Sequence, residues 1–97
     1  MTLHTVNLLP GDPACADCCA VLGVGDAVLF HGDGAWLARQ GAPWLEQWAA
    51  TGATLHVLAA DLAACGLADA CDPRIETLDA PGLVALSEGH ARQRGWY

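Results

Sequence analysis

The chain has 97 residues, which fits one domain spanning residues 1–97 and not two, because domains cluster near ~100–150 residues. Its 11 acidic residues face only four arginines and no lysine, for a net charge of −7. This balance excludes direct nucleic-acid binding, which needs cations that displace counterions. Hydrophobic residues make up 54% of the chain, 19 of them alanine, so intrinsic disorder is excluded and we expect small apolar surface to pack against partner chains.

Nothing in the sequence predicts export or membrane insertion. The N-terminus has neither a cationic start nor an apolar signal run. The longest uncharged stretch, Gln47 to Ala60, is too short and too polar to span a bilayer. We therefore expect a soluble, cytoplasmic protein that contacts no membrane, and in that compartment its five cysteines should be free thiols.

Strands and helices alternate along the chain, and the helices have clear end signals. Asp12 can cap a helix that opens at Pro13. Asp79 can cap a later helix, and Gly66 is placed to end another. In chain order we expect strand 3–7, helix 13–22, strand 26–31, short helix 35–39, helix 43–50, strand 54–58, helix 60–65, strand 74–78 and helix 80–88.

This order of elements predicts the fold. Strands that alternate with helices are typical of parallel βαβ units, and the apolar run at 27–30 is typical of a strand buried on both faces. The tail at 90–97 could add a short final strand or dock over the sheet. We expect an α/β protein, built as a three-layer α/β/α sandwich with a mainly parallel sheet of four or five strands.

The most conspicuous motif is Cys15-x-x-Cys18, followed directly by Cys19. A C-x-x-C after a strand occurs in thioredoxin-like redox sites, so a stand-alone thiol protein using Cys15 and Cys18 is one hypothesis. A reactive thiol needs a lowered pKa, from a helix N-terminus or a nearby cation. Asp12 and Asp17 lie nearby instead, and this favours the interpretation of these cysteines as small buried hydrophobes.

A metal site is a weaker hypothesis. Zinc could pair Cys15 and Cys18 with two later cysteines, but Cys65 and Cys71 form a C-x5-C instead of the C-x2-C of a zinc knuckle. Histidines on the predicted strands could be recruited, yet their spacing gives no support, and core histidines are the simpler interpretation. These are His4, His31 and His56. We expect no metal and no cofactor.

Two glycine pairs are candidates for phosphate-binding turns. Gly23-x-Gly25 precedes a strand, so it cannot be the turn of a dinucleotide-binding fold. Gly32-Asp33-Gly34 follows a strand, where backbone amides could cradle an anion. The third glycine is missing, so a tight turn is the preferred interpretation. No Ser-His-Asp constellation and no acid–base pair of carboxylates can be argued.

Four tryptophans are unusual beside one phenylalanine and one tyrosine. Trp44 and Trp48 share one helix face, because they lie four residues apart. Core packing could absorb one or two tryptophans, and partner contact is an equal alternative because tryptophan is a common interface anchor. The four are Trp36, Trp44, Trp48 and Trp96.

The order of several short motifs resembles one family over essentially the full length. The motifs are Leu3-His4-Thr5, Gly25-Asp26 before an apolar strand ending at Asp33-Gly34, Leu58 to Leu67, Leu78-Asp79 before Leu83 to Ser87, His90, and Gln93-x-x-Trp96. In this order they are similar to the TusB/DsrH family of small sulfur-relay subunits.

The resemblance implies a DsrE-like fold and a heterohexamer with two copies each of three related subunits. The two sister subunits would be TusC- and TusD-like, or DsrF- and DsrE-like. One branch of these complexes relays persulfide sulfur toward 2-thiouridine at the tRNA wobble position, and the other hands sulfur on during dissimilatory sulfur oxidation. In both, a downstream protein accepts the sulfur, and the principal sulfur-carrying cysteine usually lies on a sister subunit.

The resemblance also implies a site for an auxiliary sulfur acceptor. A DsrH-type cysteine in the first helix corresponds to Cys19 when counted from His4, or to Cys18 when counted back from Asp33. Both cysteines are candidates, in a subunit that is itself non-catalytic or auxiliary to a sulfurtransferase. Three departures from the family pattern leave the fold intact: Gly32 in place of a polar residue, Ala80 in place of an aromatic residue, and Cys65 in place of arginine.

Overall fold

A computed structural model describes residues 1–97 and contains one five-stranded sheet. The strands are β1 (Thr2–Val6), β2 (Ala27–Phe30), β3 (Thr54–Leu58), β4 (Glu76–Leu78) and β5 (Arg92–Trp96). They lie in the order β4-β3-β2-β1-β5, and every neighbouring pair is parallel. The predicted α/β fold and parallel sheet are confirmed, and the tail adds a strand beside β1.

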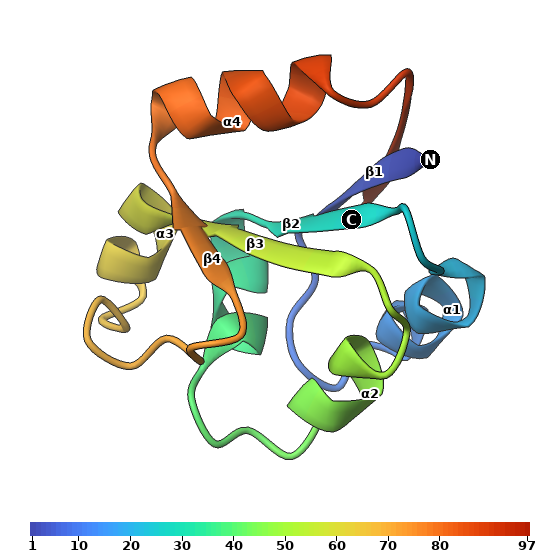
Figure 1. Cartoon of the computed structure of the whole chain (residues 1–97). Coiled ribbons are helices and arrows are strands. Elements are labelled where there is room, and N and C mark those ends of the chain that lie inside the picture. The colour runs from blue at the N-terminus through green and yellow to red at the C-terminus, as the bar shows by residue number, and fades with distance from the viewer.

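Helices cover the two faces of the sheet unequally (Figure 1). They are α1 (Pro13–Val21), the 3₁₀ helix η1 (Gly32–Ala38), α2 (Leu45–Ala49), α3 (Ala59–Ala64) and α4 (Ala80–Glu88). The larger core cluster joins Val6, Phe30 and Val57 of the sheet to side chains of α1, η1, α2 and α3. On the opposite face, α4 alone packs its Leu83 and Leu86 against Leu3 and Leu29 of the sheet. The three-layer arrangement is therefore confirmed.

The helix ends follow the signals in the sequence. The Asp12 side chain accepts a hydrogen bond from the Ala14 amide at 2.9 Å, and Pro13 opens α1. The Asp79 side chain accepts one from the Gly82 amide at 2.8 Å at the start of α4. Gly66 has φ +73 after α3, the left-handed conformation that favours glycine at a helix end.

Two elements begin two residues later than predicted. The α2 helix begins at Leu45 and not at Pro43, because Ala42 to Leu45 form a separate turn in which the Leu45 amide donates to the Ala42 carbonyl at 3.2 Å. The β4 strand begins at Glu76 and not at Arg74. The Arg74 amide donates a hydrogen bond to the Asp72 side chain at 2.8 Å, and this local bond holds Arg74 in a turn instead.

The segment after β2 passes very close to the end of β1. The strand ends at Phe30, so His31 precedes η1 and donates its amide to the Val6 carbonyl at 3.0 Å. A Cβ atom on Gly34 would lie 2.1 Å from that same carbonyl oxygen. Only glycine fits here, which accounts for the Asp33-Gly34 step.

No helix of the structure has both the length and the apolar character that crossing a bilayer would require.

Candidate functional site

Helix α1 carries three of the five cysteines, and each has a different environment. Cys18 is fully buried in the larger core cluster, and burial raises its pKa to about 12. Cys19 is partly buried, and burial together with the neighbouring Cys15 thiol raises its pKa to about 11. Both candidates are therefore protonated thiols at neutral pH, but only Cys19 reaches the surface.

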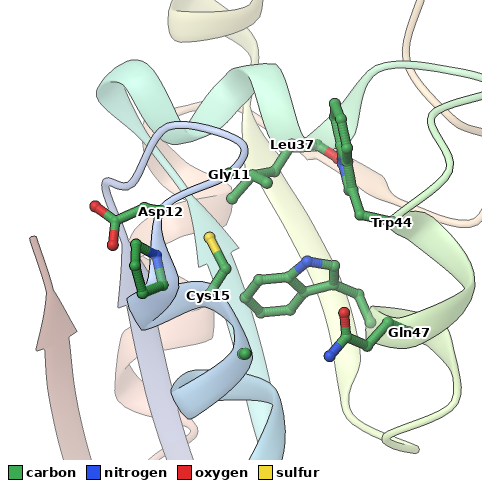
Figure 2. A pocket seen from close by; sticks show the side chains of 9 residues that line it. Gly11, Asp12, Cys15, Leu37, Trp44 and Gln47 are labelled. Atoms are coloured by element: carbon green, nitrogen blue, oxygen red, sulfur yellow. The ribbon is translucent and has the colours of Figure 1, made fainter.

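The third cysteine of α1 lines a pocket between α1, η1 and α2. Figure 2 shows the Cys15 sulfur directed into this space, with Leu37 and Trp44 across from it and Gln47 at the α2 side. The pocket has a volume of about 380 Å³, and Trp48 is also part of its lining. Burial, and next the Asp12 carboxylate, raise the pKa of the Cys15 thiol.

Cys19 lines a second hollow that adjoins this pocket. Its volume is about 300 Å³, and it shares Ala16 and Gln47 with the Cys15 pocket. Cys15 and Cys19 lie one helical turn apart, which places them on the same face of α1. The structure therefore brings two accessible thiols to one groove between α1 and α2, while Cys18 points to the core.

The two remaining cysteines lie elsewhere. Cys65 follows α3, where burial and the carboxylates of Asp33 and Asp61 raise its pKa. Cys71 lies in the loop before β4 and contacts the Ile75 carbonyl oxygen at 3.9 Å. All five cysteines are free, and no three His, Cys, Asp or Glu side chains lie close enough to hold a metal ion. The zinc hypothesis therefore has no supporting cluster.

His4 and Trp96 are joined by a hydrogen bond across β1 and β5. The indole Nε1–H of Trp96 donates to His4 Nδ1 at 3.1 Å, and the Arg94 guanidinium lies 4.2 Å from the centre of the Trp96 ring. Burial lowers the pKa of His4, which leaves a neutral ring able to accept this bond. His4 is thus a core residue that fixes the last strand.

Two further histidines, His31 and His56, also have structural environments. His56 is buried, with Nδ1 2.9 Å from Glu76 Oε1 and Nε2 2.9 Å from the Thr54 hydroxyl. The His31 ring lies edge-on to Tyr97, with 6.4 Å between the ring centres. No hydrogen bond joins either ring to a cysteine, so neither histidine is placed as a general base for a thiol.

The glycine turn after β2 does not leave its amides free for an anion. The Gly32 amide donates to Asp61 Oδ2 at 2.8 Å, and the Asp33 amide donates to Asn7 Oδ1 at 2.9 Å. The Gly34 amide donates to the His31 carbonyl at 2.9 Å. This agrees with the tight-turn interpretation.

The tryptophans divide between the core and the surface. Trp48 is 1% exposed and packs edge-on against Phe30, with 5.1 Å between ring centres. Trp44 and Trp96 are partly buried against the larger core cluster, whereas Trp36 is 38% exposed. Of the four tryptophans, only Trp48 is completely buried in the core, and part of the Trp36 side chain is exposed to solvent.

Comparison with known proteins decides the family. A family model described as DsrH-like protein matches residues 11–93. Protein TusB of Klebsiella pneumoniae (strain 342) is 32% identical over 94 residues, which cover 97% of this chain and 99% of that protein. The chain belongs to the DsrH family.

A second relative supports the same assignment. Protein TusB of Photorhabdus laumondii subsp. laumondii is 32% identical over 76 residues, 78% of this chain and 80% of that protein. The resemblance to the TusB/DsrH family in the sequence motifs is thereby confirmed. In this DsrH-family chain the matched region contains all three cysteines of α1, from Cys15 to Cys19.

Two features of this DsrH-family site were not found from the sequence. The His4–Trp96 hydrogen bond joins two motifs, Leu3-His4-Thr5 and Gln93-x-x-Trp96, that were recognised separately. The Cys15 pocket depends on Trp44 and Trp48 lying beside the first turn of α1. The sequence predicted that Trp44 and Trp48 lie on one face of a helix, but it did not predict that this face lies against α1.

Proposed function

We propose that this protein is a subunit of a cytoplasmic sulfur-relay complex that passes persulfide sulfur from protein to protein. Membership of the DsrH family, with two relatives named TusB, is the observation that carries the proposal. Its partners would be two related sister subunits, TusC/TusD-like or DsrF/DsrE-like, arranged as a heterohexamer. The relay would lead to a downstream sulfur-acceptor protein, for 2-thiolation of tRNA wobble uridine or for dissimilatory sulfur oxidation.

Within this complex, Cys19 is our choice for the auxiliary sulfur acceptor. Persulfide transfer is attack by one thiolate on the outer sulfur of another residue's persulfide, so the accepting thiol must be reachable. Cys19 lines a surface hollow, whereas Cys18 has no exposed surface. Burial raises the pKa of Cys19 to about 11, so in this proposal the chain has an assisting role and a docked partner supplies the cations that would lower that pKa.

The alternative, a stand-alone thiol enzyme using Cys15 and Cys18, has less support. Burial raises the pKa of both thiols, that of Cys18 to about 12, which suppresses the nucleophilic thiolate. Cys18 is also shut off from any substrate by the core around it.

The test is sulfur uptake from a sister subunit. The chain is mixed with a persulfide-loaded sister subunit, and the mass of each protein is measured. We expect this chain to gain the mass of one sulfur, to lose that gain in Cys19→Ser, and to keep it in Cys18→Ser. Uptake that survives in Cys19→Ser, or no uptake by the native chain, would contradict the role of Cys19.

A further inference from the structure

The Cys15 side chain faces open space, which is unusual for a cysteine that merely fills a core. Cys15 packs partly against the larger core cluster, but its sulfur is directed into the pocket (Figure 2). Its one hydrogen-bond contact is long, at 3.7 Å from the Leu9 carbonyl oxygen. The pocket volume of about 380 Å³ is large beside the ~30 Å³ that a water molecule occupies in the liquid. The space beyond the Cys15 sulfur can therefore hold at least one further atom of sulfur.

The aromatic walls of this pocket are fixed before anything binds. The Trp44 indole Nε1–H donates to the Leu37 carbonyl at 2.8 Å, which ties α2 to η1. The Trp48 ring is 1% exposed and is held edge-on against Phe30. Contact between sulfur and an aromatic ring is favourable, so the pocket favours an additional sulfur atom without rearrangement.

The charge around the pocket disfavours anionic reagents. No arginine lines it, the chain has no lysine, and Asp12 is part of the lining. Anionic nucleophiles that would strip sulfur from a persulfide are therefore repelled by the carboxylate and hindered by the indole walls. This environment suits the holding of sulfur better than its rapid exchange with solvent.

We propose that the pocket is a sulfur-holding site, in which Cys15 carries a persulfide sheltered by Trp44 and Trp48. This inference rests on the proposed sulfur-relay function and extends it. Cys19, in the adjoining hollow, receives the sulfur at the surface, and Cys15 retains it one helical turn away.

The transfer between the two thiols is balanced and needs no oxidant. The Cys15 thiol loses its proton to solvent, and its sulfur attacks the outer sulfur of the Cys19 persulfide. A new S–S bond forms on Cys15 while the S–S bond on Cys19 breaks. The released electron pair stays on the Cys19 sulfur, which takes up a proton and returns to the thiol.

The test compares two variants of the full chain, each of which lacks one of the two thiols of the groove. Cys19→Ser and Cys15→Ser are each treated with excess sodium polysulfide until neither gains further mass, because the Asp12 carboxylate slows this anionic donor as well. Each is then freed of excess reagent and exposed to cyanide, which removes persulfide sulfur as thiocyanate, and the modified cysteine is located by peptide mass spectrometry. We expect Cys19→Ser to hold one sulfur on Cys15, with a drop in tryptophan fluorescence. Cyanide should remove that sulfur more slowly than the one held on Cys19 in Cys15→Ser, whose fluorescence should not change.

Replacing a tryptophan of the pocket tests whether the aromatic wall protects the sulfur on Cys15. In the Cys19→Ser background, Trp44→Leu should speed the removal of sulfur by cyanide, while Trp36→Leu, outside the pocket, should leave the rate unchanged. Circular dichroism of each variant tests whether the fold persists. The inference is overturned if Cys15 takes up no sulfur, or if cyanide removes sulfur from both cysteines at one rate. Uptake by Cys19 from a sister subunit is measured separately, so the proposed function can stand when this inference fails.

Discussion

At the residue scale, the α1 thiols are set apart by burial and by one carboxylate. Burial raises the pKa of Cys15, Cys18 and Cys19, and the Asp12 carboxylate adds to this effect at Cys15. The sequence predicted that the local acids would favour the thiol form, and the structure agrees for Asp12. The sequence did not show which of the three cysteines is buried, because that depends on how α1 packs on the sheet.

Removing the charge of Asp12 should make Cys15 more reactive. Asparagine caps a helix about as well as aspartate, so Asp12→Asn should change the free energy of unfolding by no more than about 0.5 kcal/mol. The pKa of Cys15 should fall, because one of its two causes is removed. We expect iodoacetamide to alkylate Cys15 a few times faster at neutral pH, as followed by peptide mass spectrometry.

Asp17→Asn is the matched control, because Asp17 lies on the exposed side of the same helix and does not shift the pKa of Cys15. An equal acceleration in both variants would show that the net charge of the chain, and not Asp12, sets the reactivity.

Alkaline pH should destabilise the fold through Cys18. Its pKa rises from 9.0 to about 12 on folding, so the folded state keeps a proton that the unfolded chain releases. The stabilisation from the protonated Cys18 thiol is complete below pH 9.0, and it is lost as the pH rises toward the pKa of this thiol in the folded state. Urea unfolding on either side of 9.0 should show a steeper loss for the native chain than for Cys18→Ala. Equal slopes would mean that Cys18 is not buried as described.

At the element scale, the sequence predicted the elements whose bounds depend on nearby residues better than those that depend on contacts between distant residues. Strand 54–58 and helix 80–88 match the expected bounds, because alternation, caps and glycine stops are local signals. The start of β4 was misplaced because side-chain and amide bonds from Arg74 to Asp72 compete with the sheet. The role of the tail was left open because the bond from Trp96 to His4 joins the two ends of the chain.

The close approach at Gly34 gives a sharp test of the η1 packing. Gly34→Ala would place Cβ 2.1 Å from the Val6 carbonyl oxygen, a backbone atom that cannot move aside. We expect a loss of about 2–3 kcal/mol in the free energy of unfolding. Gly23→Ala, with nothing within 4 Å of the new Cβ, should stay within about 0.5 kcal/mol of the native chain. Thermal or urea unfolding measures both, and a neutral Gly34→Ala would refute the contact.

At the scale of the whole molecule, the composition fits the proposed role of a small domain that works with partners. Four arginines among 97 residues leave little surface suited to a nucleic acid, so in a relay toward tRNA that contact would belong to another protein. Four of the five strands, β1 to β4, lie side by side in chain order, and β5 lies on the other side of β1. The sequence predicted the parallel βαβ units but not this order. The groove between α1 and α2 was not predictable, because it joins Cys15 to Trp44 across 29 positions of the chain.

The proposed role of the protein is that of a subunit of a multi-chain sulfur relay. Its most direct test is native mass spectrometry of this chain co-expressed with its two sister subunits. We predict a stable complex that contains all three chains, with this chain present in the same copy number as each sister. A monodisperse monomer of this chain, beside sister subunits that assemble without it, would contradict the claim.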